Sequence, residues 1–162
     1  MNLDELGPWL VEQRWFGSKG RELTGVEVLD LPVLDPEPPL LGVALVTVHF
    51  AAGAEEIYQL PLALDPDGEL HDLLADRPAS NRLLRLIEGA GEATSERGRV
   101  DFGWNREQAL IPAGAEGRPI AAEQSNTSVV YGENAILKIF RRVEAGINPE
   151  LEMLRFLGRR GF

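Results

Sequence analysis

The chain has no cysteine among its 162 residues, which excludes a disulfide scaffold, a thiol nucleophile and a cysteine-based zinc or iron–sulfur site. Lysine is almost absent as well: of the 16 basic residues 14 are arginine, and the two lysines are Lys19 and Lys138. The two histidines, His49 and His71, lack the neighbouring ligands that a metal site requires. The sequence therefore predicts no metal site, and a surface or half-buried position for each histidine.

Long apolar runs are also missing. The longest core-like stretch, residues 40–50, has the length of a strand and is far shorter than the ~20 residues of a membrane span. The N-terminus is acidic where a secretory signal would be basic, which favours a cytoplasmic protein. A net charge of −10 argues against nucleic acid or an anionic membrane as the main partner.

The composition is that of a folded protein, with 44% hydrophobic and 26% charged residues, and the length allows one compact domain or two small ones. Charge is unevenly distributed along the chain. Residues 1–120 hold 21 acidic and 10 basic side chains, whereas residues 121–162 hold 5 and 6. This difference indicates two regions with different roles, the second better suited to an anionic ligand.

Apolar patterning predicts a mixed helix and strand content. Near the N-terminus we expect a short helix that starts at Pro8 and ends at Trp15 or Phe16. The further expected elements are an antiparallel meander of strands at 24–33, 41–51 and 57–64, helices at 69–75 and 81–90, and a strand at 97–104. After a connector at 106–118 come strands at 120–123, 128–131 and 135–141, with a turn at 124–127, and a helix that Asn148 caps and Pro149 begins.

Lys138 stands out because it lies in an apolar strand of a chain that otherwise uses arginine. A charge in such a strand needs a partner, and Glu150 and Glu152 in the following helix are the nearest candidates. The small polar residues at 124–127 could cover phosphates with their amides and hydroxyls. The alternative is a lysine that extends to solvent from an edge strand beside solvated glutamates.

These segments resemble bacterial maltokinases. The resemblance lies in residues 123–130 (EQSNTSVV), 135–143 (AILKIFRRV) and 146–152 (GINPELE). Residues 13–16 (QRWF) and 20–23 (GREL) resemble the N-terminal cap of the same family. Related glucosamine kinases and other aminoglycoside-phosphotransferase-like enzymes share much of this layout.

The resemblance implies an α+β fold in three parts: a cap at 1–105, built on an antiparallel β-meander with flanking helices, the connector at 106–118, and a partial protein-kinase-like N-lobe at 119–162. The turn of Ser125, Asn126 and Thr127 would cover the phosphates of ATP. Lys138 would hold the α- and β-phosphates, and Glu152 would orient it. Glu150 is the less favoured partner, because the family accepts either Asp or Glu there.

The implied parent activity is ATP- and Mg²⁺-dependent phosphorylation of maltose to maltose 1-phosphate. In this family the catalytic base and the Mg²⁺ ligands lie in a C-terminal lobe, in a His-Gly-Asp-type loop and a later Asp. Neither His49 nor His71 begins such a loop, so we expect no catalytic residue in these 162 residues and no turnover by them alone. Two alternatives stay open: another sugar kinase, such as a glucosamine kinase, or a non-catalytic docking module for a trehalose synthase, suggested by the acidic, tryptophan-bearing N-terminal region.

Overall fold

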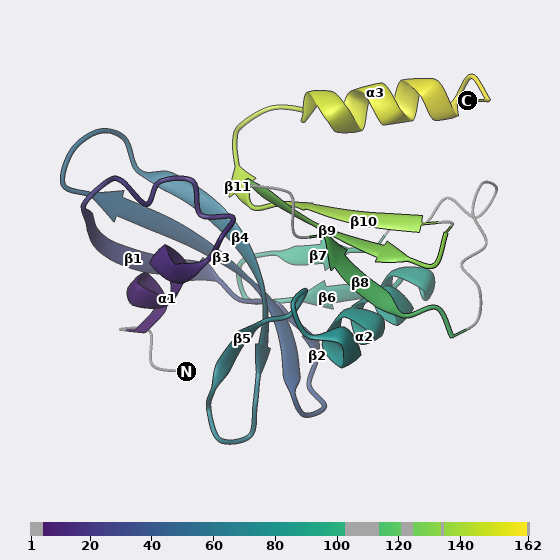
Figure 1. Ribbon diagram of the computed structural model, residues 1–162, viewed down its shortest axis with the longest axis horizontal. Coiled ribbons are helices and arrows are strands. Elements are labelled where there is room, and N and C mark those ends of the chain that lie inside the picture. Colours follow the sequence, from purple (N-terminus) through teal and green to yellow (C-terminus); the bar gives the residue numbers. More distant parts are fainter. Residues whose placement is uncertain (1–4, 103–113, 121–124, 134, 162) are drawn as a thin grey trace.

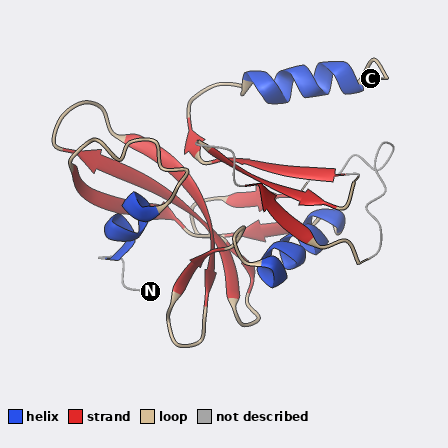
Figure 2. Cartoon of the chain, in the orientation of Figure 1, coloured by secondary structure: helices blue, strands red, loops and turns tan. Residues whose placement is uncertain are grey.

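The computed structural model describes residues 5–102, 114–120, 125–133 and 135–161 (Figure 1). Their fold is α+β, as expected, and all strand pairs are antiparallel (Figure 2). The helices are α1 (Leu6–Glu12), α2 (Arg77–Glu88) and α3 (Pro149–Gly158). The strands are β1 (Leu23–Asp30), β2 (Val33–Asp35), β3 (Leu40–Phe50), β4 (Glu56–Leu64), β5 (Leu70–Asp72), β6 (Glu92–Thr94), β7 (Arg99–Asp101), β8 (Gly117–Ile120), β9 (Asn126–Tyr131), β10 (Ala135–Phe140) and β11 (Arg142–Val143).

The larger sheet has six strands in the path β1-β3-β4-β11, with β2 paired to β3 and β5 paired to β4. Strands β1, β3 and β4 form the predicted meander, with bounds within a few residues of those expected. This part was predictable because long apolar strands separated by proline- or glycine-rich turns pair with their neighbours in sequence.

Two elements near the middle of the chain differ from the prediction. Residues 69–75 were expected to be helical, but β5 pairs there with the end of β4. The seven residues are too few for a stable helix alone, and the edge of β4 supplies a strand partner. Helix α2 begins four residues earlier than expected, because the Asp76 carboxylate caps it by accepting a hydrogen bond from the Ala79 amide at 2.8 Å.

Helix α1 also differs, since it begins before Pro8 and ends before Trp15. Proline is tolerated in the first turn, where its missing N–H has no helical partner. The predicted strand at 97–104 is β7, and its expected last residue, Trp104, lies outside the described residues.

A smaller sheet has the strand order β10-β9-β8, and β6 and β7 form a separate hairpin. Strand β8 lies earlier than the predicted strand at 120–123, most of which falls outside the described residues. Strand β9 begins at Asn126, two residues earlier than the strand predicted at 128–131. Of the three residues predicted to cover phosphates, Asn126 and Thr127 therefore belong to the strand, and Ser125 lies just before it.

The two regions expected from the sequence share a hydrophobic core. Val129 and Tyr131 of β9 are fully buried in the same cluster as Leu73, Leu74 and other residues of the first region. In addition, β11 pairs with β4 and so joins the larger sheet (Figure 1). The C-terminal segment is therefore packed into the meander rather than tethered to it.

Helix α3 is the exception to this packing. All ten of its residues are described, and none is buried. It lies over the outer side of β10 (Figure 1), and it exposes the large apolar side chains Leu151, Met153, Leu154 and Phe156. Among the described residues, no helix has the length and apolar character needed to cross a membrane.

Candidate functional site

Strand β10 has two unlike faces, and Lys138 lies on the open one. Ala135, Leu137 and Ile139 pack against the core cluster. Because side chains alternate along a strand, Lys138 shares the opposite face with its neighbours two positions away, one of which is the 66% exposed Ile136. The lysine side chain is itself 28% exposed. Lys138 therefore lies on the side of β10 that faces away from the core cluster.

The structure pairs Lys138 with Glu150, whereas the family resemblance favoured Glu152. The ammonium donates hydrogen bonds to both carboxylate oxygens of Glu150, at 2.8 and 2.9 Å. The cap explains this choice: Asn148 accepts hydrogen bonds from the Glu150 and Leu151 amides and so sets the first turn of α3. Glu152 is two positions further on, about 200° around the helix axis, and its side chain is exposed.

The ion pair between Lys138 and Glu150 is partly open to solvent, with side-chain exposures of 28% and 46%. Pairs in such surroundings contribute about 0–1 kcal/mol. The pair therefore adds little to the stability of the fold.

The polar residues before β10 divide between the two faces of the small sheet. In the ladder Ser128 lies opposite Lys138, and Thr127 lies opposite Ile139. Residues directly opposite in an antiparallel pair share a face, so Asn126 and Ser128 lie on the lysine side and Thr127 on the core side. Ser128 is nevertheless buried, with 2% of its surface exposed.

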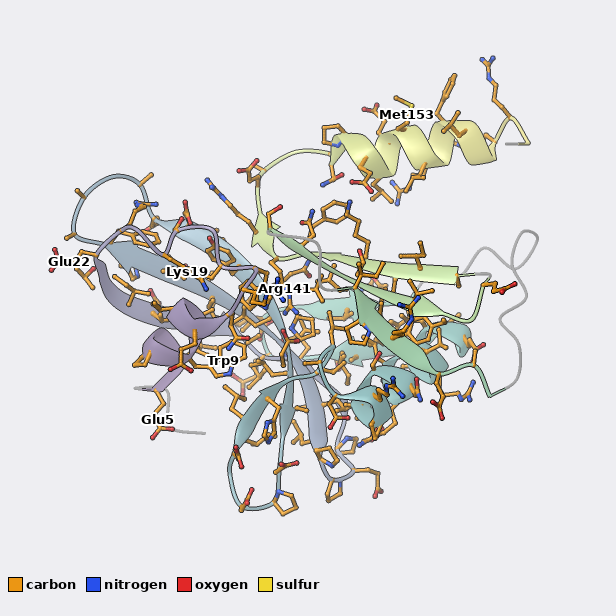
Figure 3. All side chains as sticks on the ribbon, viewed as in Figure 1. Glu5, Trp9, Lys19, Glu22, Arg141 and Met153 are labelled. Carbon is orange, nitrogen blue, oxygen red and sulfur yellow. The ribbon has the colours of Figure 1, made fainter. Side chains whose placement is uncertain are left out.

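On the core side of the small sheet, the Thr127 hydroxyl accepts a hydrogen bond from a buried arginine. Arg141, which follows β10, has no solvent exposure, and its Nε donates to the Thr127 hydroxyl at 2.9 Å. Its Nη2 donates to both carboxylate oxygens of Asp72, at 2.6 and 2.9 Å. Arg141 lies where the two sheets meet (Figure 3).

Trp15 completes this cluster. Its indole N–H donates to Asp72 at 3.0 Å, and its ring lies 4.4 Å from the guanidinium carbon of Arg141. Burial lowers the pKa of Arg141, and the charge and hydrogen bonds of Asp72 act in the opposite direction. Within the described residues, Nη1 of Arg141 is buried without a hydrogen-bond partner.

Arg142, the residue after Arg141, forms a second ion pair between the C-terminal segment and the meander. It lies 3.1 Å from Glu56, which also pairs with Arg21 and accepts hydrogen bonds from Ser18 and Tyr58. Burial would raise the pKa of Glu56, but the hydrogen bonds from Tyr58 and Ser18 and the two arginine charges outweigh it, and the pKa is lowered. Burial, together with the Glu56 carboxylate, raises the pKa of Tyr58 to about 12.

Two hollows flank this region. One of about 440 Å³ opens beside Phe140, Gln59 and the segment 142–149 that leads to α3. A smaller one, of about 180 Å³, is lined by Asn126 and Thr127 on one side and by Trp15 and Asp72 on the other. The predicted phosphate-covering residues thus lie at a junction with the meander.

A hairpin turn far from Lys138 in the sequence changes the interpretation of His71. The ligand atoms of Asp65, Glu69 and His71 lie within 4.8 Å of one another. The sequence indicated that His71 lacks further metal ligands nearby, but β4 and β5 bring two carboxylates to it. Nε2 of His71 is 2.9 Å from the Asp65 carboxylate, a hydrogen bond that joins the two ends of the hairpin.

The protein thus combines an antiparallel meander with a small three-stranded sheet packed against it. Lys138 in the small sheet forms an ion pair with Glu150 of helix α3. Residues 9–82 match the family model of the maltokinase N-terminal cap domain. The chain therefore has a maltokinase-type N-terminus, which implies a kinase as its parent class. The match includes Trp15, Glu56 and Asp72, three of the residues through which this region contacts Arg141 and Arg142.

The docking hypothesis for a trehalose synthase stays a prediction. That hypothesis drew on tryptophans in the acidic N-terminal region, but Trp15 is only 6% exposed and belongs to a core cluster. Its ring packs edge-on against Trp9 and Phe16. Trp15 therefore contributes to the fold of this region.

Proposed function

We propose that this chain is the N-terminal part of an ATP-dependent sugar kinase that phosphorylates maltose to maltose 1-phosphate, with ATP bound along the outer face of the small sheet. Lys138 contacts the α- and β-phosphates, and Ser125 and Asn126, at the start of β9, cover the phosphates. Mg²⁺ accompanies the nucleotide. The observation that carries the proposal is the pairing of a strand lysine with a helix-α3 carboxylate beside polar strand residues, behind a maltokinase-type cap.

Electrostatics supports an anionic ligand at this place. The segment 121–162 has one more basic than acidic side chain, in a chain whose net charge is −10. Lys138 is the one lysine there, and its pair with Glu150 is weak enough to be rearranged around a phosphate. Glu150 then orients the ammonium, a role that the family resemblance implied for Glu152.

The direct test is calorimetric titration of the 162-residue chain with MgATP. We expect saturable binding by the wild type and a loss of affinity of at least tenfold in Lys138→Ala, the size expected for removal of a charge-assisted hydrogen bond. Lys19→Ala is the matched control, because Lys19 is the other lysine, is exposed and lies in the turn between α1 and β1. Identical titrations of wild type and Lys138→Ala would refute the nucleotide site.

Turnover is a separate matter, because the resemblance places the catalytic base and the Mg²⁺ ligands in a C-terminal lobe. We expect no ADP release by this chain with maltose, MgATP and a coupled assay. The exposed apolar side chains of α3 fit a surface that such a lobe would cover. The acceptor is testable on a complete kinase: a maltose preference supports the proposal, and a glucosamine preference selects the alternative.

A further inference from the structure

The geometry points to the cap as a working part of the nucleotide site: Asp72 and Trp15 position Thr127 through the guanidinium of Arg141. Arg141 acts here as a positioning residue, since nothing places it in contact with a nucleotide. The inference rests on the proposed function for its link to ATP. Its structural half, the control of the start of β9 by cap residues, stands on contacts in the described residues alone.

The three groups around Arg141 come from three different elements. Nη2 is held by the Asp72 carboxylate at the end of β5, and the guanidinium lies against the Trp15 ring, in the segment after α1. Nε then donates to Thr127, the second residue of β9. A guanidinium is planar and rigid, so fixing one edge against Asp72 fixes the direction of its Nε–H. The position of Thr127 is thereby tied to the cap.

Burial strengthens the contact between Arg141 and Asp72. Arg141 has no exposed surface and the Asp72 side chain is 10% exposed, so water does not screen their interaction. The backbone is held as well: the carbonyl of Arg141 accepts from the Gln59 amide at 2.8 Å, and the carbonyl of Phe140 accepts from the Gln59 side chain at 2.7 Å. Lys138 lies three residues before Arg141, so one anchored segment carries both the lysine and the contact to Thr127.

The neighbouring pair of Arg142 and Glu56 provides an internal control. It also joins the C-terminal segment to β4, but Arg142 is 50% exposed and its contacts are to Glu56 and Glu144. Loss of that pair weakens the junction without touching Thr127. If the Arg141 cluster served only to hold the two regions together, the two links would behave alike.

The first arm of the test needs no nucleotide. We expect Asp72→Asn to raise amide hydrogen exchange at Thr127 and Ser128 about tenfold relative to the amides of β3, and Arg142→Gln to leave that ratio unchanged. Trp15→Phe is the second variant: it keeps an aromatic ring over Arg141, removes the N–H donor to Asp72 and makes the buried ring smaller, and a smaller rise at the same amides is expected. A uniform rise across the sheets in Asp72→Asn and Trp15→Phe, or the same ratio in Arg142→Gln, would overturn the inference.

The second arm uses MgATP titrations at Thr127 itself. Thr127→Val keeps the shape and removes the acceptor for Arg141, and it should weaken binding about fivefold or more. Thr127→Ser retains the hydroxyl and should restore wild-type affinity. Equal affinities for Val and Ser would refute the link to the nucleotide. If the wild type itself binds no MgATP, the proposed function fails, while the exchange measurements still decide whether the cap positions β9.

Discussion

Gly117, the first residue of β8, packs where helix α2 meets the small sheet, and replacing it with alanine should destabilise the protein. An added Cβ would lie 2.8 Å from the Ser80 hydroxyl, 2.9 Å from a ring carbon of Tyr131 and 3.0 Å from a methyl group of Val129. These three residues are essentially buried and have no room to retreat. The Ser80 and Tyr131 hydroxyls are also hydrogen-bonded to each other at 2.8 Å.

Overpacking of this kind costs about 1–3 kcal/mol. In a protein of this size each kcal/mol lowers the melting temperature by roughly 2–4 °C, so Gly117→Ala should melt roughly 2–12 °C below the wild type. The shift should affect a single transition, because the two regions share the core around Tyr131.

Thermal unfolding followed by circular dichroism, with urea unfolding alongside, measures both quantities. Gly25→Ala is the matched control: Gly25 lies in strand β1, and beyond its chain neighbours an added Cβ would meet no heavy atom of the described residues within 4 Å. Adding Ser80→Ala to Gly117→Ala removes the nearest obstructing atom, so the double variant should lose less than the sum of the two single losses. A Gly117→Ala protein that melts within about 1 °C of the wild type would refute the packing argument.

Three further predictions concern single carboxylates. Since the pKa of Glu56 is lowered in the fold, its carboxylate stabilises the protein above the ordinary value of 4.5 and loses that effect as the pH falls through the folded-state pKa. Urea titrations should therefore show Glu56→Gln about 2 kcal/mol less stable than wild type at pH 7, with the gap closing in acid; a pH-independent gap contradicts this. Glu150→Gln should weaken MgATP binding by at most about fivefold, given the modest strength of a partly exposed ion pair, and Glu152→Gln should leave it unchanged. Equal calorimetric effects of these two variants would contradict the observed pairing. Asp76→Ala removes the cap of α2 and should cost about 1 kcal/mol in urea unfolding; no loss would mean that the cap hydrogen bond to Ala79 is not formed in solution.

Much of the fold was predictable from local signals. The meander follows from three long apolar strands with turn residues between them, and the start of α3 follows from Asn148 and Pro149, whose cap hydrogen bonds the structure contains. Strand β5 was not predictable in this way. Its residues have a short helical pattern, and only the edge of β4, a tertiary feature, makes them a strand.

The candidate site shows the same division. Lys138 was identified from its residue type and its strand, and Glu150 was one of two carboxylates considered. The choice between them depended on the direction of the first turn of α3, which the sequence leaves open. Asp72 was not identified from the sequence, because its partner Arg141 is 69 residues away and no local pattern joins them.

The adjacency of Arg141 and Arg142 has a consequence for how this segment can change in length. One arginine reaches Asp72 and the next reaches Glu56, so the two contacts depend on consecutive side chains leaving the backbone in different directions. Deleting or inserting a single residue between Lys138 and Arg141 would shift the lysine to the other face of β10, or move both arginines away from their carboxylates. Neighbouring side chains can compensate for a substitution in this segment, but they cannot compensate for an inserted or deleted residue. The three-residue spacing from Lys138 to Arg141 therefore sets the position of the lysine relative to the cap.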